Sequence, residues 1–158
     1  MAVDVDGVIS IFGFDGPPEE VDGSFHLIDG MAHCISDRAG PELQRLSEVY
    51  ELIWATGWED RANDHLPALL GLSGDLPCLH FDGQARFGSA HWKLDALDRY
   101  SGDRPLAWID DSLDHSCHEW ALARGAPTLL APTEPDIGIT EEHTEKLLAW
   151  VRDGYTRG

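Results

Sequence analysis

Two aspartates close to the start of the chain are the first residues whose type and spacing suggest chemistry. Asp4 and Asp6 lie two positions apart at the end of an apolar run that begins at Ala2, and Gly7 then lets the backbone turn. An extended chain points residues two apart to the same side, so we expect the two carboxylates side by side. Like charges held that close need a cation or a shared proton, and a bound Mg²⁺ would supply the cation. The alternative is a turn in which Asp6 and Gly7 simply end a strand.

The rest of the chain must form the elements that position these carboxylates. Apolar runs predict further strands at 50–55, 78–81, 105–109 and 128–131, and helical spacing predicts helices at 37–50, 60–70, 90–100, 113–124 and 140–152, the last with Thr140 as its cap. Strands that alternate with helices imply a parallel sheet covered by helices on both faces. We therefore expect an α/β fold, a Rossmann-like three-layer sandwich around a central parallel sheet of about five strands.

A short β-hairpin is expected directly after the acidic pair. Apolar and small residues alternate from Val8, a turn-forming Asp-Gly-Pro-Pro follows at 15–18, and a strand-like run ends at Asp29 and Gly30. This pattern predicts a flap over approximately residues 8–30. The segments before Thr56 and after Asp82 are too short for a large cap domain, so residues 1–158 are expected to form a single domain.

Other polar residues fall at equivalent places further along the chain. Thr56 follows the second predicted strand, Lys93 lies near the start of a predicted helix, and Asp110 and Asp111 follow the fourth strand. Ligands of a parallel α/β sheet bind beyond the carboxyl ends of its strands, which is where Asp4 also belongs. Simpler interpretations exist for each: Thr56 could merely end a strand, Lys93 could be an exposed helix lysine, and the aspartate pair could cap the following helix.

Taken in order, these motifs resemble those of the haloacid dehalogenase-like (HAD) hydrolase superfamily. The D-x-D-G of residues 4–7, Thr56 after an apolar strand, the lone Lys93 and the pair Asp110-Asp111 match its four motifs, and the resemblance covers nearly the whole chain. It implies a phosphatase, a phosphoric monoester hydrolase that works through a covalent aspartyl-phosphate. Haloalkanoic-acid dehalogenases of this superfamily lack the acid/base residue that corresponds to Asp6. The presence of Asp6 therefore favours phosphate chemistry over carbon–halogen cleavage.

The resemblance also implies a role for each catalytic residue. Asp4 would attack phosphorus, and Asp6 would protonate the leaving oxygen and later activate water. Thr56 would donate a hydrogen bond to the transferred phosphoryl group, and Lys93 would neutralise its charge. The Mg²⁺ cofactor would be held by hard oxygen ligands from Asp4, the backbone carbonyl of Asp6 and Asp110, and by Asp111 either directly or through water.

Three residues beside these positions are candidates for substrate binding. Gly57 and Trp58 follow Thr56 directly, and Trp92 precedes Lys93. The aromatic rings could form a stacking surface for a base or a sugar. The alternative is that either tryptophan is a core residue.

Composition limits the partners. The chain carries 29 acidic and 11 basic residues, for a net charge of -18, which argues against non-specific nucleic-acid binding. No apolar run approaches the length of a membrane span, and no secretory signal pattern is visible. The three widely spaced cysteines do not suggest a disulfide framework. We therefore expect a cytoplasmic protein without a membrane partner.

The substrate is the least determined prediction. Capless members of the superfamily tend to act on bulky substrates, such as proteins or nucleic-acid ends, or to close the site as homo-oligomers. The Asp-Val-Asp-Gly-Val start and the Trp-Ile-Asp-Asp strand look most similar to small HAD domains associated with bacterial RNA-repair proteins. A phosphatase acting on nucleic-acid ends is therefore the first hypothesis. A small-molecule phosphatase for a nucleotide or sugar phosphate and a non-catalytic HAD-like binding module are the alternatives.

Overall fold

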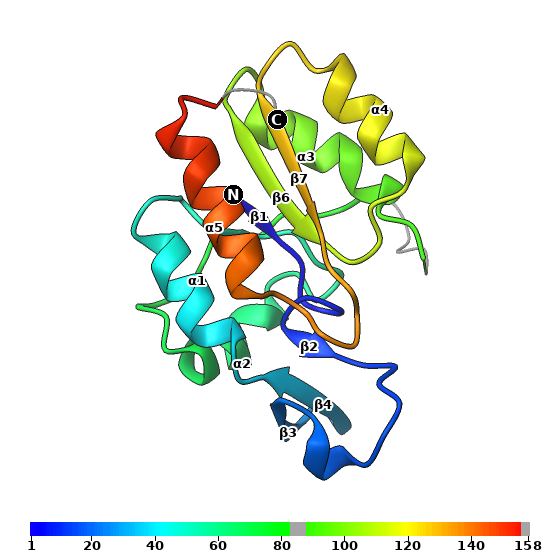
Figure 1. Cartoon of the computed structure of the whole chain (residues 1–158). Coiled ribbons are helices and arrows are strands. Elements are labelled where there is room, and N and C mark those ends of the chain that lie inside the picture. Colours follow the sequence, from blue (N-terminus) through cyan, green and yellow to red (C-terminus); the bar gives the residue numbers. More distant parts are fainter. Residues whose placement is uncertain (83–87, 156–158) are drawn as a thin grey trace.

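A four-stranded parallel sheet forms the centre of the molecule (Figure 1). The computed structural model describes residues 1–82 and 88–155. The strands are ordered β5-β1-β6-β7, and their bounds are Ile53–Trp54, Ala2–Val3, Leu106–Asp110 and Thr128–Pro132. All three pairings are parallel, as the alternation of strands and helices predicts.

Helices cover both faces of this sheet and complete a three-layer α/β fold (Figure 1). One face is covered by α1, α2 and α5, and the other by α3, which follows the short 3-10 helix η2, and by α4. Their bounds are Ala39–Ser47, Arg61–Leu70, Glu141–Arg152, Leu94–Ser101, His91–Lys93 and His115–Ala123, in the order just given. Because side chains alternate along a strand, Val3 packs toward α1, α2 and α5, and Ala2 toward α3 and α4.

Directly after β1 the chain builds a second, antiparallel sheet, which we call the flap. It consists of β2 (Ser10–Ile11), β3 (Gly23–Ile28) and β4 (Met31–Ser36) in the order β2-β4-β3, with the 3-10 helix η1 (Pro18–Glu20) between β2 and β3. The predicted flap is confirmed, but it has three strands and extends to Ser36. Asp29 and Gly30, both at positive φ, form the turn between β3 and β4.

The predicted strand at 78–81 is wrong in extent. Cys78 forms only an isolated parallel bridge with Trp54, supported by a hydrogen bond from the Leu79 backbone N–H to the Trp54 carbonyl. The chain then leaves the sheet, since the Phe81 N–H donates to the Glu59 side chain instead of to a strand. The described residues therefore form four parallel strands where about five were expected.

Helix ends confirm one prediction and decide one alternative that the sequence left open. Thr140 caps α5 in a capping box with His143, as predicted. Helix α4 is capped by Asp114, so Asp110 and Asp111 do not cap it. Among the residues that the structure describes there is no cap domain, and no helix combines the length and apolar character needed to cross a bilayer.

Candidate functional site

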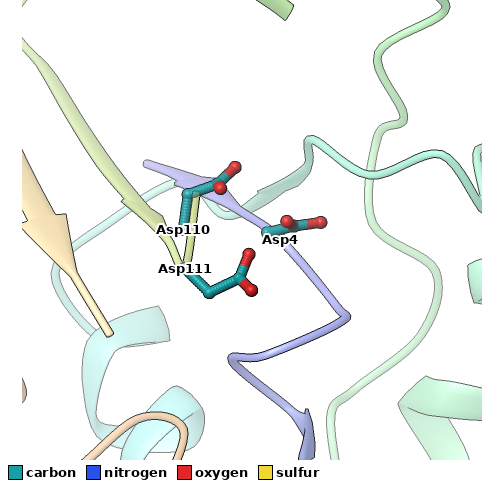
Figure 2. Close-up of side chains that lie close together, drawn as sticks. All are labelled: Asp4, Asp110 and Asp111. Carbon is teal, nitrogen blue, oxygen red and sulfur yellow. The ribbon is translucent and has the colours of Figure 1, made fainter. Parts of the chain in front are cut away.

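Three aspartates meet where the two central strands end (Figure 2). Asp4 directly follows β1, Asp110 is the last residue of β6, which is buried throughout, and Asp111 comes next. Because β1 and β6 are parallel neighbours, their carboxyl ends lie at one edge of the sheet. One carboxylate oxygen from each aspartate lies within 4.8 Å of the others.

Lys93 is the positive charge of this cluster. Its Nζ lies 2.8 Å from Asp4 Oδ2 and 2.7 Å from Asp110 Oδ2, and the residue is only 3% exposed. Burial alone would lower the pKa of Lys93, but the charges of Asp4 and Asp110 outweigh it and raise the pKa. Lys93 is therefore a charged, buried partner of two carboxylates, and its interpretation as an exposed helix lysine is wrong.

The cluster brings three carboxyl groups together with one ammonium group. Burial raises the pKa of Asp4, Lys93 opposes that rise, and Asp110 adds to it. Burial also raises the pKa of Asp111. Ionising all three carboxyl groups beside one ammonium group is therefore unfavourable, and a divalent cation would stabilise their ionised forms. Hard carboxylate oxygens are also the ligands that Mg²⁺ prefers, so this donor set fits that ion.

Backbone groups hold two of the carboxylates in place. The Val5 N–H donates to Asp4 Oδ1 at 2.8 Å, and the Ser112 N–H donates to Asp110 Oδ1 at 2.9 Å. Each carboxylate thus uses one oxygen for a backbone N–H and the other for Lys93. The orientation of both groups is fixed before any ligand binds.

Gly7 is required for the position of Asp111. Its φ is +73°, a region that side chains disfavour, and a Cβ at this position would lie 2.5 Å from the Cβ of Asp111. Its carbonyl accepts a hydrogen bond from Thr133 Oγ1 at 2.8 Å. The glycine of the D-x-D-G motif therefore lets the first loop pack directly against the loop that carries Asp111.

Asp6 lines the same cavity as the three aspartates, but its carboxylate is not part of their cluster. Its side chain is exposed, and its Oδ2 accepts a hydrogen bond from Trp58 Nε1 at 3.0 Å. The three carboxylates that could hold a metal do not include that of Asp6, whose expected metal contact is through its backbone carbonyl. That metal contact stays a prediction.

Thr56 follows β5, the strand on the other side of β1. It is 1% exposed, and its Oγ1 accepts a hydrogen bond from the Trp58 N–H at 3.3 Å. Because that bond uses a lone pair, the hydroxyl proton stays free to be donated. Thr56 and Gly57 both line the cavity.

A cavity of about 710 Å³ joins these residues to the flap. Trp92 lines it, and Lys93 Nζ lies 5.3 Å from the centre of the Trp92 ring. Trp58 is 8% exposed and packs in the core, with its ring edge-on to His33 at 4.7 Å. The flap contributes a wall formed by Ser10, Ile11, Phe12, Ala32, His33 and Cys34.

No protein-family model matches the chain, and no curated protein or solved structure is significantly similar to it. What the structure adds to the sequence motifs is a parallel α/β sheet with a buried aspartate cluster at the end of its first strand.

The residues of β4 that line the cavity are among those that the sequence interpretation missed. His33 and Cys34 belong to β4, for which no strand was predicted. A signal was present, because an Asp-Gly pair after a strand-like run is typical of a hairpin turn and implies a second strand directly after it. Asp29 and Gly30 form such a turn, and β4 begins at the next residue.

Proposed function

We propose that this protein is a Mg²⁺-dependent phosphohydrolase of the HAD type, a phosphomonoesterase that forms an aspartyl-phosphate on Asp4. The observation that carries the proposal is Lys93, which is buried and bridges Asp4 and Asp110 within the acidic cluster. Burying a lysine and several carboxylates together is unfavourable for folding unless they are well paired, and such groups gather at functional sites. The order Asp4, Asp6, Thr56, Lys93, Asp110 also agrees with the motifs of that superfamily.

The proposed reaction has two steps at Asp4. A carboxylate oxygen of Asp4 attacks phosphorus, the bond from phosphorus to the ester oxygen breaks, and the proton of Asp6 goes to the leaving oxygen. Asp6 then takes a proton from water, the water oxygen attacks phosphorus, and the bond to Asp4 breaks to release inorganic phosphate. The Thr56 hydroxyl and the Lys93 ammonium stabilise the charge of the phosphoryl group in both steps.

The metal has a defined place in this proposal. A Mg²⁺ held by Asp4, Asp110, Asp111 and the Asp6 carbonyl would neutralise charge on the transferred phosphoryl group. Without it, the carboxylates that the reaction needs in their ionised form would repel a phosphate ester.

The character of the cavity favours a small phosphomonoester over a nucleic-acid end. Its volume of about 710 Å³ lies in the range of small-molecule sites, and Ile11, Phe12, Trp92 and Pro135 give it an apolar wall. Among its described lining residues the only cation is Lys93, which Asp4 and Asp110 already pair. A polynucleotide would bring further phosphates close to the four aspartates of the cavity. Repulsion between these negative charges disfavours its binding.

Phosphate release tests both the activity and the substrate class. The panel contains an aryl phosphate, nucleotides, sugar phosphates, and oligonucleotides phosphorylated at either end, each with Mg²⁺ or with a chelator. We expect Mg²⁺-dependent turnover that Asp4→Asn abolishes and that Asp103→Asn, a change of an exposed aspartate, leaves intact. Preference for oligonucleotides would restore the nucleic-acid-end hypothesis. Equal inactivity of wild type and Asp4→Asn on the whole panel would leave the non-catalytic binding module.

A further inference from the structure

The indole of Trp58 makes a contact that the proposed reaction does not yet use. Its Nε1–H donates to Asp6 Oδ2 at 3.0 Å, so a buried donor holds an exposed carboxylate. An exposed aspartate side chain normally samples several rotamers. A hydrogen bond from a fixed donor restricts that sampling.

Trp58 itself is held from two sides. Its backbone N–H donates to Thr56 Oγ1 at 3.3 Å, and its ring packs edge-on against His33 of the flap at 4.7 Å. His33 is held in turn by a hydrogen bond between its Nδ1 and Ser10 Oγ at 2.9 Å. The indole is therefore fixed between the end of β5 and the flap, and its donor has a defined direction.

We propose that Trp58 is a positioning residue for Asp6. This role rests on the proposed phosphohydrolase activity. By engaging Oδ2, the indole N–H directs the Asp6 carboxyl group into the cavity and leaves Oδ1 to transfer the proton to the leaving oxygen. Trp58 then acts through Asp6, and no contact of its ring with the substrate is needed.

The role predicts a dependence on the leaving group that a general loss of structure would not produce. An alkyl phosphate has a strongly basic leaving oxygen that needs a proton from Asp6, whereas p-nitrophenolate leaves readily without one. The ratio kcat/KM covers the steps up to phosphoryl transfer to Asp4 and excludes the later hydrolysis of the aspartyl-phosphate. A misplaced Asp6 should therefore lower kcat/KM for the alkyl ester much more than for p-nitrophenyl phosphate.

The test compares Trp58→Phe, which keeps an aromatic ring and removes the N–H, with wild type, with Asp6→Asn and with Trp120→Phe. Trp120 is a half-buried tryptophan on α4 outside the cavity lining and is the matched control. We expect Trp58→Phe to lower kcat/KM for the alkyl phosphate by about 10-fold or more and for p-nitrophenyl phosphate by less than about 3-fold, because a positioned general acid contributes about 10²–10⁴-fold. Trp58→Phe combined with Asp6→Asn should be no worse than Asp6→Asn alone.

A second measurement reads the hydrogen bond without turnover. The indole N–H resonance of Trp58, assigned by its disappearance in Trp58→Phe, should move upfield in Asp6→Ala, while that of Trp120 stays in place. An unmoved Trp58 resonance, or an equal loss of kcat/KM on both esters in Trp58→Phe, overturns the positioning role and leaves the phosphohydrolase proposal standing. A wild-type protein inactive on both esters overturns the phosphohydrolase proposal and the role that rests on it.

Discussion

Two regions of the molecule differ from the usual division between buried apolar residues and exposed charged ones. They are the end of the parallel sheet and the flap, and they differ in opposite ways. At the sheet end, charged groups are buried, with Asp110 fully buried and Lys93 3% exposed. On the flap, large apolar side chains are exposed, with Phe25 50% and Leu27 78% exposed. Folded proteins usually bury apolar groups and expose charged ones. The contrast shows that the well-packed layers around β1 and β6 tolerate an unfavourable cluster of charges, whereas the flap joins the core through Ile28 and Ile35 and leaves other apolar side chains of β3 exposed.

This contrast predicts that substitutions in the two regions affect the free energy of unfolding and the activity differently. Changes at the sheet end should alter the free energy of unfolding and the activity together, because the charged groups pair with one another inside the core. Changes of exposed flap side chains should have little effect on unfolding, because they bury little apolar surface, and only those that line the cavity should alter activity.

Lys93→Met should produce the largest effect. Removing the ammonium leaves Asp4 and Asp110 buried without their cation, and the loss of one partner from a buried ion pair lowers the free energy of unfolding by about 3–5 kcal/mol. Urea unfolding in chelator measures this loss, and added Mg²⁺ should restore part of it. The flap change Leu27→Ala is the control, with an expected loss under about 0.5 kcal/mol. Equal losses in the two variants would remove the contrast.

Gly7→Ala and Gly13→Ala form a matched pair across the two regions. Both glycines have a positive φ, +73° and +77°, but a Cβ at Gly7 would overlap Asp111 whereas a Cβ at Gly13 meets nothing within 4 Å. We expect Gly13→Ala to lower the free energy of unfolding by about 1–2 kcal/mol through backbone strain alone. Gly7→Ala should lower it by about 2–4 kcal/mol, because overlap is added to strain.

The same pair separates the metal site from general stability. If Mg²⁺ binds the aspartate cluster it raises Tm; displacement of Asp111 should then make this rise smaller in Gly7→Ala, while Gly13→Ala keeps the full rise. Thermal unfolding with and without Mg²⁺ measures both quantities. A full Mg²⁺ response in Gly7→Ala would mean that Asp111 does not take part in binding the ion.

How far the sequence predicts the molecule also differs between the two regions. The strands ending at Asp4 and Asp110 were predictable because they are buried on both faces and read as continuous apolar runs followed by acidic residues. The burial of Lys93 was not predictable from its helix, since its exposure depends on two carboxylates from other elements. In the flap, Met31–Ser36 lacks the alternation that marks a half-buried strand, because its last three residues are all buried.

The contact between Asp6 and Trp58 shows a further limit. The sequence placed Trp58 beside Thr56 and suggested a stacking surface, but it could not show which way the indole N–H points. That direction depends on His33 packing against the ring from β4, a strand absent from the predicted flap. Motif residues at strand ends follow from local pattern, whereas contacts between the sheet and the flap depend on the three-dimensional pairing of distant segments.

Phe12→Ala should produce a smaller effect, on substrate turnover. Phe12 lines the cavity from the flap side and is 37% exposed, so its removal takes apolar contact from a bound leaving group. We expect kcat/KM for an aryl phosphate to fall by about 3- to 10-fold, which corresponds to an aromatic contact of about 0.5–1.5 kcal/mol. Phe25→Ala, on the flap but outside the cavity lining, is the control and should leave kcat/KM unchanged. If both variants lose activity equally, the flap acts as a unit and its cavity wall has no separate role.

The smallest effect is expected at the tip of the flap, where Asp29 pairs with α2. Its carboxylate lies 3.5 Å from Arg61 Nη2 and 3.6 Å from His65 Nε2, and Arg61 and Asp29 are both well exposed. Asp29→Asn removes the charge, and asparagine tolerates the positive φ of 49° at this position, so backbone strain is not added. Exposed ion pairs contribute about 0–1 kcal/mol, and we expect the free energy of unfolding to fall by less than about 0.5 kcal/mol.

Hydrogen exchange should nevertheless become faster for backbone amides of β3 and β4 and stay unchanged for those of β6, because only the flap loses an attachment. A fall in the free energy of unfolding above about 1 kcal/mol, or faster exchange in β6, would contradict this expectation. Loss of an exposed ion pair on the flap would then destabilise the buried strands as well, which means that the flap and the parallel sheet unfold as one cooperative unit.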